Sequence, residues 1–372
     1  MKKKIFVVLG GIIILFLLLN GNNKKTDKPN GESQNTQSRQ TYQPSSRPLP
    51  KGGRILGIDA NETDSVDYNT AFALAKEAGV QAVSLSLNWD SFETEPEKYG
   101  LEPNYLQIAN LYYPPRDTSL NLSIRPVDTN GKRLPADLKG KKLSDPVVIE
   151  RFNKFLDYAL ETLKDTGLNF LAVGNEIDIP FGGNAQEWEE YGVFLKEAAN
   201  HVHKIKPGLP VGAVITLNGL NENRQEQSKK IGQLSDIVIT TYYPMTETAV
   251  KNSGEVEKEV ENLLKNYPDR PIYFAEAGMP TTSLLGSSQE KQAQFIKTMF
   301  QIWDKNISRI KLVSFSWLND ISESQSRNFE KYYGSSDPKF LGFLQTLGLM
   351  DREGKAKKGY DALKAEAKAR GW

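Results

Sequence analysis

The chain has 372 residues, with 47 basic and 46 acidic side chains and a formal net charge of +1. This near-balance argues against a protein whose task is to neutralise nucleic-acid phosphates. The absence of cysteine excludes disulfides, thiolate metal sites and a cysteine nucleophile, and only two histidines are present. Carboxylates, hydroxyls and aromatic rings are therefore the available chemistry, and we expect neither a metal nor a cofactor.

The first residues are predicted to direct export. Lysines at positions 2–4 precede an unbroken apolar or glycine run over residues 5–19. A helix of that length reaches about 22 Å, short of the roughly 30 Å hydrocarbon core of a bilayer, which favours a cleaved export signal. The lack of a small-residue cleavage site after Leu19 equally fits an uncleaved membrane tether. Residues 1–19 are thus a signal peptide or a signal anchor, and we expect an extracellular or cell-surface protein.

The next segment is predicted to be a linker. Residues 20–53 are rich in Asn, Gln, Ser, Thr, Pro and charged residues, with Tyr42 and Leu49 as the large apolar side chains. Such a segment buries too little surface to offset its ordering entropy, so we expect it to be disordered. The folded body is then predicted to cover residues 54–372.

Short β-rich runs alternate with helical patterns along this body. The runs are mostly apolar, as is typical of parallel strands covered on both faces: 54–60, 80–89, 120–128, 170–177, 211–217, 236–243, 271–277 and 310–318. Helical patterns include residues 68–78, 147–164, 255–266 and 355–370. Cap signals mark three helix starts: Asp145-Pro146, Asn184 with Glu187, and Ser287 with Glu290. Eight strands with intervening helices predict a single α/β domain, a (β/α)8 TIM barrel.

A doubly wound open sheet is the alternative architecture. It normally carries a glycine-rich phosphate loop directly after an early strand. Gly52-Gly53 precedes the first predicted strand instead, so the dinucleotide-binding fingerprint is missing.

Two glutamates end predicted strands four and seven. The active site of a TIM barrel is formed at the C-terminal ends of its strands. Glu176 follows Asn175 after strand four, and Glu276 ends strand seven. Each glutamate continues the parity of an apolar series, at 170-172-174 and at 272-274, which predicts that both point to one surface. Strands four and seven are expected to face one another, so two carboxylates would meet at one mouth, as glycosidic cleavage requires.

This pattern resembles clan A of the retaining β-glycoside hydrolases over residues 54–372. Asn175-Glu176 and Glu276 match the strand ends at which that clan carries its two glutamates. Trp89, with Glu93 and the Glu-Pro segment behind it, is similar to the stretch after strand two. Trp317 resembles the aromatic floor that the clan presents at the end of strand eight. The tail over residues 347–360 is similar to the closing stretch of these enzymes.

The resemblance implies a role for each matching residue. Glu176 would be the general acid/base and Glu276 the nucleophile. Asn175 would hold the sugar 2-hydroxyl, and Tyr243 would aim its hydroxyl at the nucleophile. The remaining candidates for substrate binding are Trp89, Trp317, Arg125 and Asp128. The last two, at the end of strand three, would bind sugar hydroxyls or orient a catalytic carboxylate.

The family within the clan stays open at this level. Gly57-Ile58-Asp59 and Tyr242-Tyr243-Pro244 resemble segments of family 53 endo-galactanases and family 17 β-glucanases. Strand three lacks the family 53 histidine, and strand seven departs from the family 17 pattern.

The predicted function is an endo-acting, monomeric hydrolase of a β-linked polysaccharide or oligosaccharide, without a nucleic-acid partner. A transglycosylase using the same residues remains an alternative, since the difference lies in acceptor affinity and water access. A non-catalytic carbohydrate-binding barrel is the other alternative, although binding alone does not require two facing carboxylates.

Overall fold

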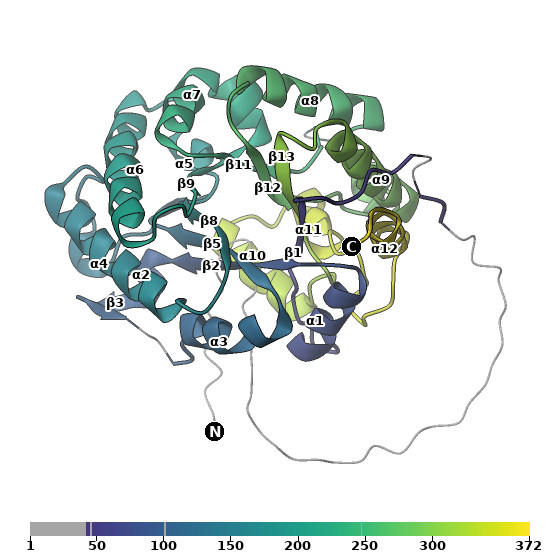
Figure 1. Cartoon of the computed structure of the whole chain (residues 1–372), viewed down its shortest axis with the longest axis horizontal. Coiled ribbons are helices and arrows are strands. Elements are labelled where there is room, and N and C mark those ends of the chain that lie inside the picture. Colours follow the sequence, from purple (N-terminus) through teal and green to yellow (C-terminus); the bar gives the residue numbers. More distant parts are fainter. Residues whose placement is uncertain (1–41, 45–46, 100–101, 247) are drawn as a thin grey trace, which may run out of the picture.

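A computed structural model describes residues 42–44, 47–99, 102–246 and 248–372 (Figure 1). The predicted signal or anchor over residues 1–19 and most of the predicted linker lie outside the described residues. In the part of the chain that is described, none of the helices has the length and hydropathy that a bilayer crossing requires.

The end of the predicted linker packs against the folded body. The Tyr42 hydroxyl donates a hydrogen bond to Glu366 at 2.8 Å, and the tyrosine ring packs against the core. The Lys51 amide donates to the carbonyl oxygen of Arg370 at 2.8 Å. Among the described residues, Tyr42 therefore contacts the body although it precedes residue 54, because this aromatic side chain has apolar surface to bury.

Parallel strands form a closed ring, and the predicted barrel is confirmed (Figure 1). The strand order is β10-β11-β12-β13-β1-β2-β5-β8-β9. The bounds are β1 (Ile55–Ile58), β2 (Ala82–Asn88), β5 (Ser119–Arg125), β8 (Leu168–Val173), β9 (Val211–Gly212), β10 (Val214–Thr216), β11 (Val238–Tyr242), β12 (Ile272–Ala277) and β13 (Ile310–Phe315). Each predicted strand is present, and the fifth is interrupted at Ala213. Because β9 pairs with β8 and β10 with β11, this interrupted strand closes the ring.

Helices surround the ring, as the alternating pattern predicts (Figure 1). Their bounds are α1 (Tyr68–Glu77), α2 (Trp89–Phe92), α3 (Tyr105–Tyr112), α4 (Pro146–Thr162), α5 (Asp178–Phe181), α6 (Ala185–Ile205), α7 (Gln225–Leu234), α8 (Ser253–Asn266), α9 (Gln289–Lys305), α10 (Glu323–Tyr333), α11 (Pro338–Gln345) and α12 (Lys358–Arg370). Asp145 caps α4 as predicted, accepting a hydrogen bond from the Val147 amide at 2.9 Å. The cap of α9 is Ser288, one residue after the predicted Ser287, whose hydroxyl instead donates to the Pro280 carbonyl at 2.6 Å.

The alternation of side chains along the strands builds two apolar layers. The outer layer lies between strands and helices and takes in Leu56, Ile58 and the apolar faces of the helices. The inner layer fills the ring with residues of the strands and with Ile237, which directly precedes β11: Phe170, Ala172, Val214, Ile237, Ile239, Ala275 and Leu312. The barrel is therefore a packed core, and its chemistry is confined to the strand ends.

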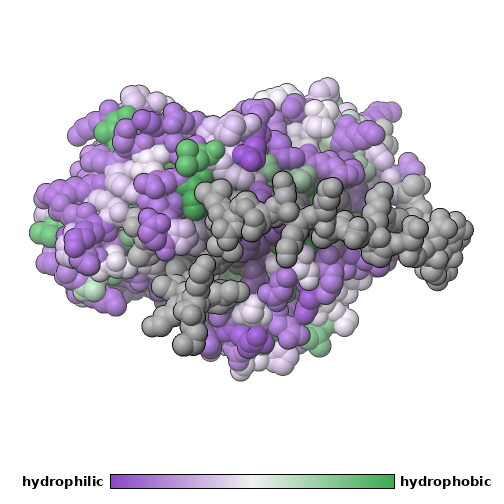
Figure 2. Space-filling view, turned by 90° about the horizontal axis from the view of Figure 1, so that it is seen from below, coloured by the Kyte–Doolittle hydropathy of each residue, from purple (hydrophilic) through white to green (hydrophobic). Residues whose placement is uncertain are grey.

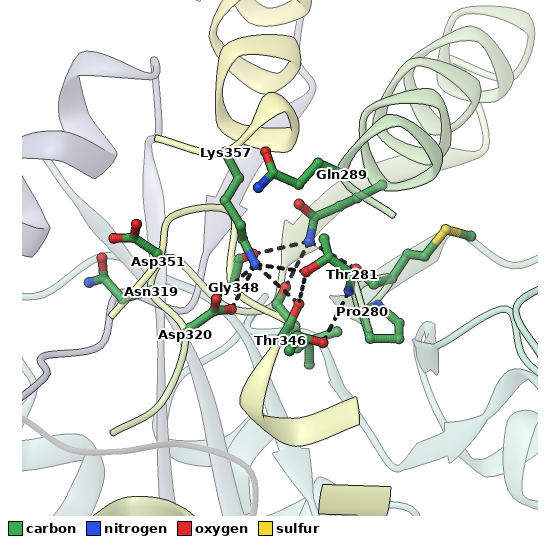
Figure 3. A network of polar contacts seen from close by, with 12 residues as sticks. Pro280, Thr281, Gln289, Asn319, Asp320, Thr346, Gly348, Asp351 and Lys357 are labelled. Carbon is green, nitrogen blue, oxygen red and sulfur yellow. Dashed lines mark hydrogen bonds and ion pairs between the residues drawn. The ribbon is translucent and has the colours of Figure 1, made fainter. Parts of the chain in front are cut away.

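Two helices that the sequence patterns did not predict, α10 and α11, follow β13. They lie across the far end of the ring in Figure 1. We call residues 320–346, which contain both helices, the α10–α11 excursion. The buried ammonium of Lys357 joins its two ends: it donates to Asp320 at 2.8 and 3.0 Å and to the Thr346 carbonyl oxygen at 3.1 Å (Figure 3). The connection between β13 and α12 is thus held as one folded unit.

The surface seen in Figure 2 is mainly hydrophilic, with apolar residues in small separate patches. The most exposed large apolar side chain among the described residues is Leu111 on α3, at 76% exposure. Scattered apolar residues of this kind are ordinary on protein surfaces.

Candidate active site

A cavity of about 430 Å³ opens at the C-terminal ends of the barrel strands. Both predicted glutamates line it, together with three other predicted site residues, Asn175, Tyr243 and Trp317. Helices α10 and α11 and the segment between them supply much of the remaining wall: Tyr333, Asp337, Lys339, Phe340, Phe343 and Leu344. The sequence patterns therefore predicted the floor of the cavity but not this wall.

Glu176 stands in a turn beyond the end of β8. The strand ends at Val173, after which Gly174 has a φ of +93° and Glu176 a φ of +44°. A Cβ atom at Gly174 would come within 2.9 Å of Ile177, so the turn needs glycine for both its backbone and its packing. The glutamate is thus directed by this left-handed turn, and not by continued strand parity.

Two threonine hydroxyls hold the Glu176 carboxyl. Thr241 donates to Oε1 at 2.6 Å and Thr129 donates to Oε2 at 3.1 Å. Burial raises the pKa of Glu176, and the hydrogen bond from Thr241 partly opposes that shift. Neither threonine was predicted from the sequence, although Thr241 directly precedes the Tyr242-Tyr243 pair.

A bulge in β12 directs Glu276. Thr240 pairs with Phe274, but the next residue, Thr241, pairs with Glu276, so Ala275 is the extra residue. Phe274 belongs to the outer layer and Ala275 to the inner one. The predicted parity argument for strand seven was therefore wrong: without the bulge, Glu276 would point outward like Phe274.

Glu276 has a different set of partners from Glu176. The Tyr243 hydroxyl donates to its Oε2 at 2.5 Å, as the sequence predicted. Arg125 places Nη2 3.9 Å from its Oε1. Burial raises the pKa of Glu276 to about 8, with further upward contributions from the charges of Asp59 and Glu176.

The strand register brings the two glutamates together. Strands β8 and β12 are three places apart in the ring, and not opposite one another as expected. Thr241, which binds Glu176, is the register partner of Glu276 on the neighbouring strand. Both carboxyls line the cavity, and the charge of Glu176 adds to the burial that raises the pKa of Glu276, so the two groups lie near each other at the mouth.

Arg125 and Asp128 support the site from below. Asn175 donates to Asp128 Oδ1 at 3.0 Å, and the Tyr332 hydroxyl donates to the other oxygen of Asp128. Arg125 pairs with Asp128 at 3.6 Å and lies against Glu276. Both residues are buried and neither lines the cavity, so of the two predicted roles the structure favours orientation of other groups over contact with a sugar.

The two predicted tryptophans have different locations. Trp317 lines the cavity and stacks on Phe329, with ring centroids 5.6 Å apart. Trp89 is fully buried, donates through Nε1 to Glu93 at 2.7 Å and packs against Phe152. The prediction of Trp89 as a substrate-binding residue is therefore wrong, because helix α2 turns its indole into the outer apolar layer.

The described residues contain no group of three or more histidine, aspartate or glutamate side chains arranged to hold a metal ion. The cavity lining includes paired carboxyls, hydroxyls, an amide and aromatic rings.

No protein-family model and no curated protein matches the sequence. Among solved structures, a GH5_18 variant from Streptomyces cattleya in complex with Manβ1-4GlcNAc matches with a TM-score of 0.65 and 16% identity, covering 85% of this chain and 80% of that one. A GH5_18 variant from Bifidobacterium longum subsp. longum, with the same disaccharide, matches with a TM-score of 0.67 and 12% identity, covering 85% and 78%.

A third similar structure is the exo-β-1,4-mannosidase Op5Man5 from an Opitutaceae bacterium. It matches with a TM-score of 0.65 and 16% identity, covering 89% of this chain and 61% of that one. At such identities the likeness establishes a shared fold, and the chain is a (β/α)8 barrel of the kind on which these proteins are built.

Proposed function

We propose that the protein is a retaining glycoside hydrolase that cleaves β-linked sugars. The observation that carries this proposal is the meeting of two carboxyls with different partners, the partly buried Glu176 and the buried Glu276, at the mouth of the barrel. Retention of configuration requires the two carboxyls to lie roughly 5 to 5.5 Å apart, with no room for an intervening water, and we propose this spacing for Glu176 and Glu276. The clan A resemblance and the similar GH5_18 and mannosidase structures support the same reading.

The partners of the two carboxyls suit two roles. Glu276 accepts from Tyr243 and faces the Arg125 cation, which favours an ionised nucleophile. Glu176 receives hydroxyl donors and has an upward-shifted pKa, which suits a group that keeps its proton until the leaving oxygen takes it. When Glu176 holds that proton, its charge no longer opposes the ionisation of Glu276.

The proposed reaction has two displacements. Glu276 attacks the anomeric carbon, the glycosidic C–O bond breaks, and Glu176 gives its proton to the leaving oxygen. Glu176 then removes a proton from water, whose oxygen attacks the anomeric carbon and releases Glu276. Asn175, held by Asp128, would bind the sugar 2-hydroxyl, a contact that strengthens as positive charge develops on the ring.

The cavity favours a short substrate. Its volume of about 430 Å³ lies at the small end of ligand-binding sites. The aromatic rings of Trp317, Tyr333 and Phe340 offer apolar surfaces to the C–H faces of a sugar. We therefore propose a short β-linked oligosaccharide as substrate, with Manβ1-4GlcNAc, found in similar structures, as the first to test. Endo action on a polymer, as expected from the sequence, would require the chain to extend beyond this cavity.

Product analysis tests the proposal. The protein is incubated with Manβ1-4GlcNAc and with β-glucan, galactan, mannan and xylan, and products are sized. Proton NMR follows the first-formed anomer, which should be β; an initial α product would exclude the double displacement. E276Q should abolish cleavage, whereas E161Q, at a side chain 80% exposed on α4, should retain it. Binding without products would favour a carbohydrate-binding barrel, and longer products would favour a transglycosylase.

A further inference from the structure

Asp59 is a buried acid beside the site that was not predicted to act in it. It follows β1, is 2% exposed, and accepts a hydrogen bond from the Ser316 hydroxyl. Its main chain binds the same segment: the Asp59 amide donates to the Phe315 carbonyl at 2.9 Å, and the Leu318 amide donates to the Asp59 carbonyl at 3.0 Å. Asp59 thus binds the chain both before and after Trp317 in the sequence.

The strand register places Asp59 at the height of Glu276. Strand β13 lies between β1 and β12, and its residue Phe315 pairs with Ile58 on one side and Ala277 on the other. Asp59, one residue after Ile58, and Glu276, one residue before Ala277, therefore lie on the two strands beside β13, close to the level of Phe315. Both carboxyls are buried at the mouth of the barrel.

The buried Arg125 side chain interacts with more than one acid in this region. The Arg125 guanidinium contacts Asp128 at 3.6 Å and Glu276 at 3.9 Å, and donates to Ser86 on β2 at 2.9 Å. Strand β2 pairs with β1, so the arginine also approaches the side on which Asp59 lies. Asp59 therefore adds a negative charge to a site in which acids outnumber the cation.

We propose that Asp59 is a positioning residue for the reaction: it holds Trp317 through Ser316 and places a negative charge near Glu276 at the mouth of the barrel. This inference rests on the proposed function. Its action runs through Ser316 and Glu276, and Asp59 itself does not line the cavity.

The electrostatics of the facing groups agree with this role. Burial raises the pKa of Asp59 to about 6, so the group is mainly ionised at pH 7. Its charge is the largest contribution after burial to the raised pKa of Glu276, ahead of that of Glu176. Arg125 and the Tyr243 hydroxyl act on Glu276 in the opposite direction, whereas the charge of Glu276 raises the pKa of Tyr333 on α10.

The D59N variant tests the charge while keeping an acceptor for Ser316. The titration of Glu276 is followed by NMR in protein labelled with ¹³C at glutamate carboxyls, with E276Q identifying the signal. We expect the pKa of Glu276 to fall by about 1 unit in D59N, the lower end of the effect of a nearby like charge. The acid limb of the pH–rate profile should move to lower pH by the same amount.

The matched control is D320N. Asp320 is another buried aspartate, three residues after Trp317 in the sequence, but its carboxylate accepts a hydrogen bond from Lys357 (Figure 3). Its loss should lower stability and leave the titration of Glu276 in place. A D59N variant with unchanged Glu276 titration would overturn the proposal.

The wild-type titration provides a second measurement if D59N does not fold. The Glu276 signal should shift in two steps, with the lower step following the titration of Asp59 near pH 6. A single step would overturn the inference. The NMR titration does not depend on turnover. A protein that shows the two-step titration but hydrolyses none of the substrates would therefore contradict the proposed function and leave the electrostatic role of Asp59 supported.

Discussion

At the scale of single residues, hydroxyl donors distinguish the two carboxyls of the site. Glu176 is bound by Thr129 and Thr241, whereas Glu276 is bound by Tyr243. Hydrogen bonds to an ionised carboxylate lower its pKa, so these donors oppose the effect of burial. The donors therefore lower the pH at which each glutamate gives up its proton, against the larger upward effect of burial.

Replacing Thr241 with valine tests this balance. T241V removes the 2.6 Å donor to Glu176 with little change of shape, so the pKa of Glu176 should rise further. We expect the alkaline limb of the pH–rate profile to move to higher pH by about 0.7 unit, because one hydrogen bond contributes about 1 kcal/mol. T240V is the control, since the Thr240 hydroxyl donates to the Thr241 carbonyl oxygen. A downward shift in T241V would contradict the assigned contact.

At the scale of elements, the departures from regular strand geometry direct the glutamates. The left-handed turn after β8 carries Glu176, and the bulge at Ala275 in β12 turns Glu276 inward. At both sites the backbone interrupts the regular alternation of side chains between the two faces of a strand. The catalytic proposal therefore depends on two local irregularities and on the regular ring that holds them.

The turn can be tested with two glycines of similar backbone. Gly174 and Gly140 have φ values of +93° and +82°, but only a Cβ at Gly174 would approach another side chain, at 2.9 Å. G140A should cost about 1 kcal/mol of unfolding free energy from backbone strain alone, and G174A clearly more. G174A should also lower kcat, because Glu176 lies two residues away. Chemical unfolding gives the free energy of unfolding of both variants, and steady-state kinetics gives kcat. An equal loss of unfolding free energy in G140A and G174A would count against the steric argument.

The α10–α11 excursion depends on the buried Lys357–Asp320 pair. K357M leaves Asp320 charged and unpaired in a buried position, which should cost about 3–5 kcal/mol. It should also raise KM, because α10 and α11 line the cavity. The neighbouring K358M removes only an exposed pair with Glu290 and should cost less than about 1 kcal/mol.

The combined variant K357M/D320N checks the source of this cost. It should be less destabilised than the sum of the two single variants, because the unpaired charge is gone. Additive losses would show that the two side chains do not act as a pair.

At the scale of the whole molecule, the buried acids link stability to pH. Glu276 has an ordinary pKa of 4.5 when unfolded and about 8 when folded, so the folded state holds a proton that the unfolded state has lost. Stability from this group is complete below pH 4.5 and is lost as pH rises through about 8. The folded environment thus disfavours the ionised form of Glu276, which is the form that attacks in the proposed reaction.

Unfolding measured between pH 5 and pH 8 tests this linkage. The free energy of unfolding of E276Q should fall less with rising pH than that of the wild type, by up to about 1.4 kcal/mol per pH unit for one proton. E161Q, an exposed substitution, should follow the wild type. Parallel curves for E276Q and the wild type would show that Glu276 ionises normally in the folded protein.

The sequence by itself determined the barrel and much of its site. Eight apolar runs and the helices between them are local patterns, and they predict the ring that the structure contains. Glu176 and Glu276 were found because the ends of parallel strands meet at one face of a barrel. Asn175, Tyr243 and Trp317, which also line the cavity, were implied by the resemblance to clan A.

Only the tertiary structure decided how the site is completed. The contact between Thr241 and Glu176 joins residues that are 65 positions apart in the sequence. The direction of the Glu276 side chain follows from a shift in the pairing of β11 with β12. Trp89 was misplaced because a one-turn helix rotates its indole away from the cavity. Such contacts depend on register and on packing between distant segments, and no local period in the sequence encodes either one.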